Sequence, residues 1–181
     1  MKGSGPLAAM PSSSNTSIQH GLAVAIRDDI RGLITASTIT GIVTDSVQER
    51  YVPTLRDFVI ASPSAGQFLF PGILVVHPRS NDSSEQRNNL QDELSFPILI
   101  AIAAPTGQDL AANDHVWFGW REVIIRQYRT KGYTISSPTT YFHRCKVEPG
   151  PVIDWDRWAK DGQFNTWFIL RFYTLQQRPQ S

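Results

Sequence analysis

The chain has 181 residues, of which 41% are hydrophobic and 18% charged, and its formal net charge is +1 at pH 7. This length fits one domain with a sizeable core, and the composition is typical of a globular protein rather than a disordered one. A net charge near zero argues against a protein that binds nucleic acid mainly by electrostatics, and no apolar run approaches the roughly 20 residues of a membrane helix. We therefore expect no membrane partner.

The first 16 residues, Met1–Thr16, consist mostly of Gly, Ser, Pro and Ala with almost no large apolar side chain. Such a composition cannot bury enough surface to order itself. We predict an extended N-terminal arm over residues 1–16 that is ordered only against neighbouring chains; a disordered tail is the alternative. The single cysteine, Cys145, excludes an intramolecular disulfide and fits folding in a reducing compartment.

An amphipathic helix is predicted from Ser17 to Ile34, because apolar residues recur at steps of four and three, and Ser17 can cap its first turn. The apolar positions are Ile18, Leu22, Ile26, Ile30 and Leu33. After the helix the pattern is weaker. Thr35–Thr44 is predicted as a transition or short strand, Val47–Phe58 as irregular or a short helical turn, and Val59–Ala61 as a brief strand.

Two long strands are predicted on either side of a polar loop. Phe68–His77 is a strand with a break or bulge at Pro71-Gly72. Leu94–Ala104 is rich in aliphatic residues, which indicates a strand covered on both faces. Between them, Pro78–Gln91 is polar apart from Leu90, and we predict a functional or mobile loop tip there.

A second helix is predicted from Asp109 to Lys131, with Thr106 or Asp109 as its cap. Its apolar stripe consists of Leu110, Trp117, Trp120, Ile124 and Tyr128. Two alternating strands, Thr139–Val147 and Asn165–Leu175, follow this helix. The expected core includes Leu99, Ile100, Trp120 and Ile124, and core packing is also expected for Trp117 and Trp167.

Consecutive strands that are joined without helices favour antiparallel pairing. We therefore predict the α+β class, with a single mixed or antiparallel sheet and two main helices packed against it. This single domain covers residues 17–175, and residues 176–181 form a polar C-terminal tail.

The sequence contains no glycine-rich phosphate loop and no nucleophile-elbow motif. Its four histidines, His20, His77, His115 and His143, have no ligand spacing between them, so a metal site would have to be assembled by folding alone. His143 and Cys145 share a predicted strand face, but side chains two apart on a strand point the same way without any chemistry. We predict no catalytic residue, no cofactor and no metal.

Two groups of residues are candidates for contacts with partners. Trp155 and Trp158 are three apart, which in one helical turn places both indoles on the same side; they either close the core or dock on a neighbouring subunit. The loop with Arg79, Asp82, Glu85 and Arg87 is the second candidate; its alternative is a solvated hairpin tip.

The order of elements resembles the tail terminator (tail-completion) proteins of long-tailed bacteriophages. The resemblance is carried by a helix that ends near Ile34, the strands Phe68–His77 and Leu94–Ala104, the helix Asp109–Lys131 and the two closing strands. It covers nearly all of the chain after Ser17. The family has no short signature motif, and the insertion from Trp155 to Gly162 and the long arm depart from its compact members, which leaves the exact neck position open.

The resemblance implies a structural virion protein of the tail or neck, assembled in the host cytoplasm, and not an enzyme. It implies a hexameric ring of identical chains that caps the tail tube and joins it to the head-to-tail connector or stopper protein. Genomic DNA would pass through this ring without its sequence being read. The loop with Arg79, Asp82, Glu85 and Arg87 would then be the candidate for an element that faces the lumen of the ring or the tail tube. A head-completion stopper or another ring component of the tail or neck is one alternative. A small enzyme with a site assembled by the fold is the alternative from a different class.

Overall fold

The computed structural model of the chain describes residues 17–50, 58–59, 68–69, 71–77, 83–86, 91–105, 110–129, 131–154, 156 and 163–177. Its elements are α1 (Ile18–Thr35), the 3-10 turn η1 (Thr44–Ser46), β1 (Val47–Arg50), β2 (Phe58–Val59), β3 (Phe68–Leu69), β4 (Gly72–Val76), β5 (Ser83–Gln86), β6 (Gln91–Pro105), α2 (Leu110–Tyr128), β7 (Tyr133–Ser136), β8 (Thr139–Phe142), β9 (Arg144–Pro149) and β10 (Gln163–Gln177).

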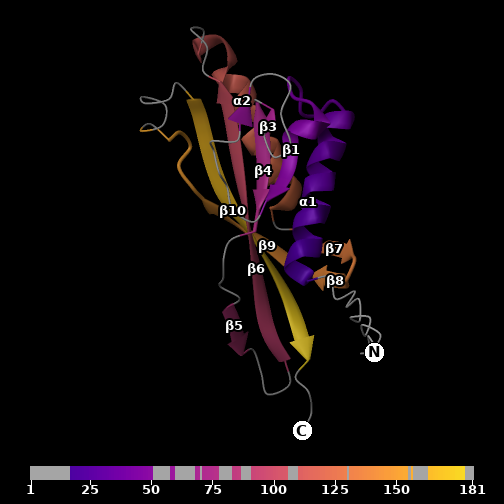
Figure 1. Cartoon of the computed structure of the whole chain (residues 1–181). Coiled ribbons are helices and arrows are strands. Elements are labelled where there is room, and N and C mark those ends of the chain that lie inside the picture. The colour runs from indigo at the N-terminus through magenta and orange to yellow at the C-terminus, as the bar shows by residue number, and fades with distance from the viewer. Residues whose placement is uncertain are drawn as a thin grey trace, which may run out of the picture.

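Six of the described strands form one mixed sheet in the order β1-β4-β6-β10-β9, with β5 also paired to β6 (Figure 1). β1 and β4 are parallel, and every other neighbouring pair in this sheet is antiparallel. β2 with β3 and β7 with β8 make two further two-stranded sheets. The α+β class with helices packed against one main sheet is thereby confirmed.

The centre of the sheet is a ribbon formed by β6 and β10. These strands pair over their whole length, from Gln91 opposite Gln177 to Pro105 opposite Gln163. β4 pairs with β6 at its inner half, over 99–103, and β5 pairs with it near its other end, over 92–95. In Figure 1 this outer end of the ribbon, residues 91–95 and 173–177, lies beyond both helices.

Both helices cover the same face of the sheet. Alternate residues of the ribbon, from Phe96 to Ala104 and from Phe164 to Phe172, join the apolar stripes of α1 and α2 in one core. The helix residues in this core are Leu22, Ala23, Ile26 and Ile30 of α1 and Trp117, Trp120, Ile124 and Tyr128 of α2. The predicted burial of Ile100, Trp117, Trp120 and Ile124 is therefore confirmed.

The opposite face of the sheet is apolar at the inner half of the ribbon and carries charged side chains further out. At the inner half, Leu74, Val76 and Ala103 are buried together, with Leu99 and Ala101 partly buried beside them. Leu99 is thus on the other face from Ile100 and only partly buried. The core position expected for Trp167 is wrong: it is 37% exposed, because it alternates with Phe168, and Phe168 takes the helix-covered side.

Three short strands were not predicted. Val47–Arg50 is the strand β1 rather than irregular chain, the polar segment after His77 contains β5, and Tyr133–Ser136 is β7. These strands are short or polar, and their extended conformation is defined by hydrogen bonds to a partner strand rather than by a local pattern. The break at Pro71-Gly72 is confirmed, since β3 and β4 lie in different sheets.

Several predicted boundaries also change. The strand predicted over Thr139–Val147 is interrupted at His143, so β8 pairs with β7 while β9 pairs with β10. As a result Tyr141 is exposed, although Phe142 and Cys145 are both buried. β10 continues to Gln177, two residues beyond the predicted strand end at Leu175. Ser17 occupies the N-cap position of α1, but its side chain makes no capping hydrogen bond.

Two glycines of α1 provide a test of how this helix packs. A Cβ at Gly21 would collide with the carbonyl oxygen of Ser137 in the β7–β8 turn, whereas a Cβ at Gly32 meets nothing within 4 Å. We expect Gly21→Ala to lower the free energy of unfolding by about 1–3 kcal/mol through overpacking, and Gly32→Ala to raise it by up to about 1 kcal/mol through helix propensity. Urea unfolding of both variants measures this. Equal stabilisation by both would mean that α1 does not contact the β7–β8 turn.

Candidate functional site

Most of the residues predicted to contact partners lie outside the described residues. This holds for Trp155, Trp158, Arg79, Asp82 and Arg87, and also for the arm over residues 1–16. Glu85 alone of this set lies in a described element: it is in β5, in register with Glu93 of β6. The polar clusters described below come from other parts of the sequence.

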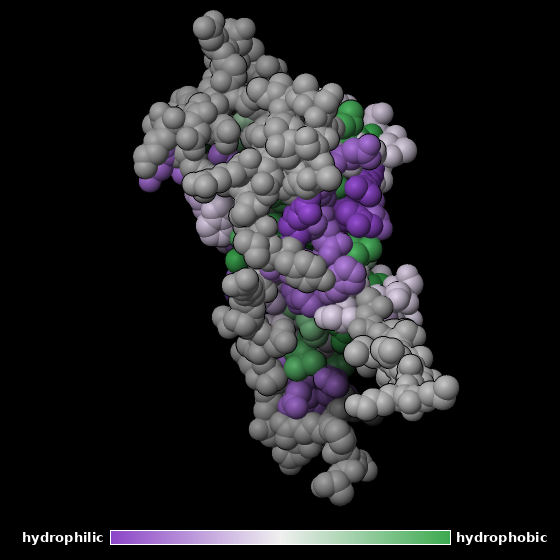
Figure 2. All heavy atoms as spheres, viewed as in Figure 1, coloured by the Kyte–Doolittle hydropathy of each residue, from purple (hydrophilic) through white to green (hydrophobic). Residues whose placement is uncertain are grey.

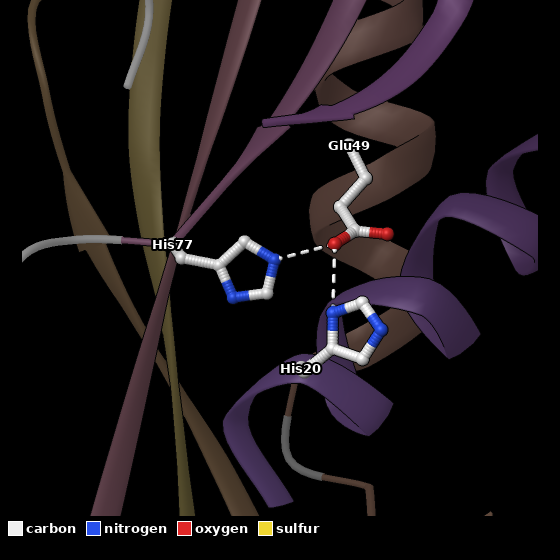
Figure 3. Close-up of side chains that lie close together, drawn as sticks. All are labelled: His20, Glu49 and His77. Atoms are coloured by element: carbon white, nitrogen blue, oxygen red, sulfur yellow. Dashed lines mark hydrogen bonds and ion pairs between the residues drawn. The ribbon is translucent and has the colours of Figure 1, made fainter. Parts of the chain in front are cut away.

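The first cluster joins His20, Glu49 and His77, which come from three different elements (Figure 3). His20 lies in the first turn of α1, Glu49 lies in β1, and His77 follows the last residue of β4. The Nδ1 atom of His20 is 3.0 Å from Oε1 of Glu49, and the Nε2 atom of His77 is 2.8 Å from the same oxygen. The two imidazole rings are stacked with centroids 5.8 Å apart.

The fold explains why these three side chains meet. β1 and β4 run parallel with Glu49 opposite Val75, and the amide of His77 donates to the carbonyl of Arg50, which continues the ladder past β4. Leu22, Ala23 and Ile26 bury the adjoining turns of α1 in the core, and this places His20 above the ends of the two strands. Within the described residues this is the one group of three metal-ligating side chains.

The cluster is largely shielded from solvent on the strand side. The side chains of His77 and Glu49 are 5% and 11% exposed, whereas that of His20 is 40% exposed. Arg27, about two helical turns after His20 on α1, approaches the second carboxylate oxygen of Glu49 at 3.6 Å and also pairs with Asp28. Hydrophilic side chains gather over this part of α1 in the view of Figure 2.

A second polar cluster lies on the outer part of the sheet face that the helices leave uncovered. Glu93 is buried there, with Nε2 of His143 at 2.8 Å and Nη2 of Arg144 at 3.0 Å from its two oxygens. The guanidinium of Arg144 also stacks over the ring of Tyr173 at 4.1 Å. One carboxylate thus joins the outer end of β6 to the start of β9.

The adjacent pair on this face is Glu148 and Arg171. Nε and Nη2 of Arg171 donate to the two oxygens of Glu148 at 2.6 and 3.2 Å, a bidentate arrangement that fixes β9 against β10. These hydrogen bonds lower the pKa of Glu148 below its ordinary value and raise that of Arg171 above its own.

A buried arginine holds α2 against the sheet. Arg121 donates to Oγ1 of Thr166 and to the carbonyl oxygens of Trp167 and Gly150, at 2.5, 3.0 and 3.3 Å, and lies over the ring of Phe168. Burial lowers the pKa of this guanidinium from its ordinary value. Neutral oxygens and an aromatic face surround the charge, which is typical of a positioning role for the β9–β10 connection.

Asp29 of α1 links the two helices and β7. It accepts hydrogen bonds from the hydroxyl groups of Tyr128 and Tyr133, at 3.2 and 2.8 Å. Burial and the neighbouring carboxylate raise the pKa of both tyrosines far above the ordinary value, so both remain protonated donors at neutral pH. The contact is structural, since both donors are held by the core.

A surface hollow of about 650 Å³ lies between α2 and β9 and contains Cys145 in its wall. Three cationic side chains line it, namely Arg129, Arg144 and Lys146. Burial raises the pKa of Cys145 to about 12, so its sulfur stays a neutral thiol at pH 7. His143, where the strand is interrupted, pairs with Glu93 instead. The geometry therefore disfavours a Cys145–His143 nucleophile, which would require a thiolate.

Comparison with known proteins gives no matching family model and no curated protein of significant sequence similarity. Neither α1 nor α2, the two long helices of the described part, has the apolar length that crossing a membrane requires.

The Glu148–Arg171 pair predicts a pH-dependent contribution to stability. A carboxylate whose pKa is lowered by folding adds stability above its unfolded pKa of about 4.3, and this gain is lost as pH falls through the folded value. We expect Glu148→Gln to lower the free energy of unfolding by about 1 kcal/mol at pH 7, with the difference from wild type shrinking towards pH 3.

Urea unfolding at both pH values measures this difference. Glu122→Gln is the matched control, because Glu122 is 71% exposed and only 3.9 Å from Arg126, so its loss should have almost no effect. An equal deficit of Glu148→Gln at pH 7 and pH 3 would contradict the assigned ion pair.

Proposed function

We propose that this chain is a structural protein of the neck or tail of a long-tailed bacteriophage. In this proposal, copies of the chain form a closed ring that caps the tail tube and joins it to the head-to-tail connector, with DNA passing through the ring. The resemblance described above supports six copies and a tail terminator position. A head-completion stopper or another ring component remains the alternative within the same class.

The observation that carries the proposal is the ribbon of β6 and β10 and its place in the fold. Both helices pack on one face of the sheet, and the outer end of the ribbon extends past them (Figure 1). A ring needs two different patches on each subunit, so that one patch meets the other on the next copy. The outer end of the ribbon provides one such projecting patch, and Leu175 on it is 41% exposed.

The sheet edges differ in how open they are to strand addition, the contact we expected between subunits. At the β1 edge, the guanidinium of Arg31 donates to the carbonyl of Val47 at 2.9 and 3.2 Å, which occupies a backbone acceptor of this edge strand. β9, the opposite edge strand, carries Arg144, Lys146 and Glu148. Charged side chains on an edge oppose unspecific pairing, so the ribbon end is the better candidate for the contact.

The charge pattern supports DNA passage without tight binding. The uncovered face of the outer sheet mixes Arg144, Lys146 and Arg171 with Glu93 and Glu148, and several of these charges neutralise one another in pairs. A protein that neutralises many phosphates needs unpaired cations. We therefore propose weak, sequence-independent contact with passing DNA.

A structural role also agrees with the state of Cys145, Tyr128 and Tyr133. The Cys145 thiol is buried with a raised pKa, and the shifted pKa values of Tyr128 and Tyr133 belong to core hydrogen bonds with Asp29. We propose on this basis that the chain is not an enzyme.

Assembly of the purified full-length chain tests the proposal. We expect native mass spectrometry or sedimentation to detect a six-membered ring, formed either by the chain alone or on isolated tail tubes. Leu175→Glu should leave the unfolding midpoint within about 2 °C of wild type but weaken ring assembly at least tenfold, because it puts a charge on the projecting patch.

Val43→Glu is the matched control. Val43 is 57% exposed, so its replacement by Glu also puts a charge in place of an exposed apolar side chain. It lies between α1 and η1, away from the outer end of the ribbon. It should assemble normally. A strictly monomeric wild-type chain at every concentration, with and without tail tubes, would overturn the proposed function. A ring that Leu175→Glu leaves intact would instead show that the contact lies elsewhere on the subunit.

A further inference from the structure

Two imidazoles and one carboxylate meet at the ends of β1 and β4, and they have the chemistry of a transition-metal site. Imidazole nitrogen and carboxylate oxygen are ligands that Zn²⁺ prefers, and two histidines with one glutamate form a known type of three-ligand set. The three donor atoms from His20, Glu49 and His77 all lie within 4.8 Å of one another. We propose that these residues bind one divalent transition-metal ion of the zinc type.

The separations between donor atoms come close to those of a metal site. Two ligand atoms that are each about 2.0–2.1 Å from a tetrahedral Zn²⁺ lie roughly 3.3 Å apart. The two nitrogen–oxygen distances here are 3.0 and 2.8 Å. Entry of the ion therefore requires each nitrogen–oxygen pair to spread by a few tenths of an ångström. The two nitrogens, which lie within 4.8 Å of each other, must turn towards the same point until they are about 3.3 Å apart.

A metal ion can replace the protons that now lie between the two imidazoles and Glu49. Without metal, each imidazole can donate a hydrogen bond from the named nitrogen to Oε1 of Glu49. A metal ion replaces those two protons: in each neutral ring the proton moves to the other nitrogen, and a charged ring releases one proton to solvent. The carboxylate keeps its negative charge and gains a metal–oxygen bond.

The burial and packing of the three side chains favour specific metal binding. His77 and Glu49 are nearly buried and are fixed by the β1–β4 ladder, so two of the three ligands are preorganised. His20 is partly exposed on the first turn of α1, which provides an entry side for the ion. Bound metal would tie this turn to the sheet, just after the arm over residues 1–16.

The guanidinium of Arg27 and a bound metal ion would compete for the same carboxylate. This guanidinium lies 3.6 Å from Oε2 of Glu49. If the cluster were only an ion-pair network, removal of Arg27 would loosen it. If the cluster binds a cation, removal of this positive charge should strengthen metal binding, on the order of tenfold for a charge at this range.

The test uses the full-length chain without a histidine tag, stripped of metal with EDTA. Zn²⁺ is titrated against a chromogenic chelator, and thermal unfolding is followed with and without the ion. We expect one Zn²⁺ per chain and an unfolding midpoint raised by about 5–10 °C when free zinc is 100 times the Kd. Mg²⁺, which prefers oxygen ligands, should cause no such shift.

His20→Gln is the main variant, because this partly exposed side chain can be changed without opening the core. It should lose zinc affinity at least tenfold while keeping the midpoint of the metal-free chain, and Glu49→Gln should lose affinity as well. His143→Gln is the matched control, since His143 also pairs with a glutamate at 2.8 Å but belongs to no three-ligand group. It should bind zinc like the wild type.

Arg27→Gln completes the set and should bind zinc more tightly than the wild type. The proposal is overturned if the wild-type chain takes up no zinc at micromolar concentration, or if His20→Gln binds as tightly as wild type. Weaker binding by Arg27→Gln would contradict the competition argued for its guanidinium, because it would show that the arginine supports the cluster. The ring proposal depends on none of these outcomes.

Discussion

The pairing of β6 with β10 over their whole length decides which side chains of the sheet face the helices. Because all 15 residues of each strand are in register, one set of alternating side chains faces the helices and the other faces away. A slip of β10 by one residue against β6 would move Phe168 and Phe172 to the uncovered side, while Ile100 of β6 stayed under the helices. The same register places β4, β5 and β9, and it aligns Glu93, Arg144 and Arg171 on the outer part of the uncovered face.

The elements with a strong local period could be predicted from the sequence. The stripes of α1 and α2 and the alternation in β10 each follow from one segment alone, and the α+β class follows from their order. Strands such as β1 and β5 could not be found in this way, because their few polar residues become strands only beside β4 and β6. The exposure of Trp167 could not be predicted either. Its size suggests a core residue, but it alternates with the buried Phe168 on β10 and is partly exposed.

The candidate metal cluster could not be predicted from the sequence, where no metal was expected. His20, Glu49 and His77 have no spacing that links them, and their meeting requires the parallel β1–β4 pair as well as α1 packed above it. A sequence signal would have been available only if Val47–Arg50 had been recognised as a strand. The candidates that the sequence does suggest, Trp155 and Trp158 with the loop around Arg79, lie outside the described residues.

We propose that the ribbon has two roles: its inner half builds the core, and its outer end contacts a neighbouring subunit. Amide hydrogen exchange measures both halves at once. In the free subunit we expect the amides of Ile98–Ala104 and Phe164–Leu170 to exchange at the rate of global unfolding, and those of Gln91–Leu94 and Thr174–Gln177 to exchange at least tenfold faster. On assembly with tail tubes the outer amides should become protected. Equal protection along the whole ribbon in the free chain, with no change on assembly, would contradict it.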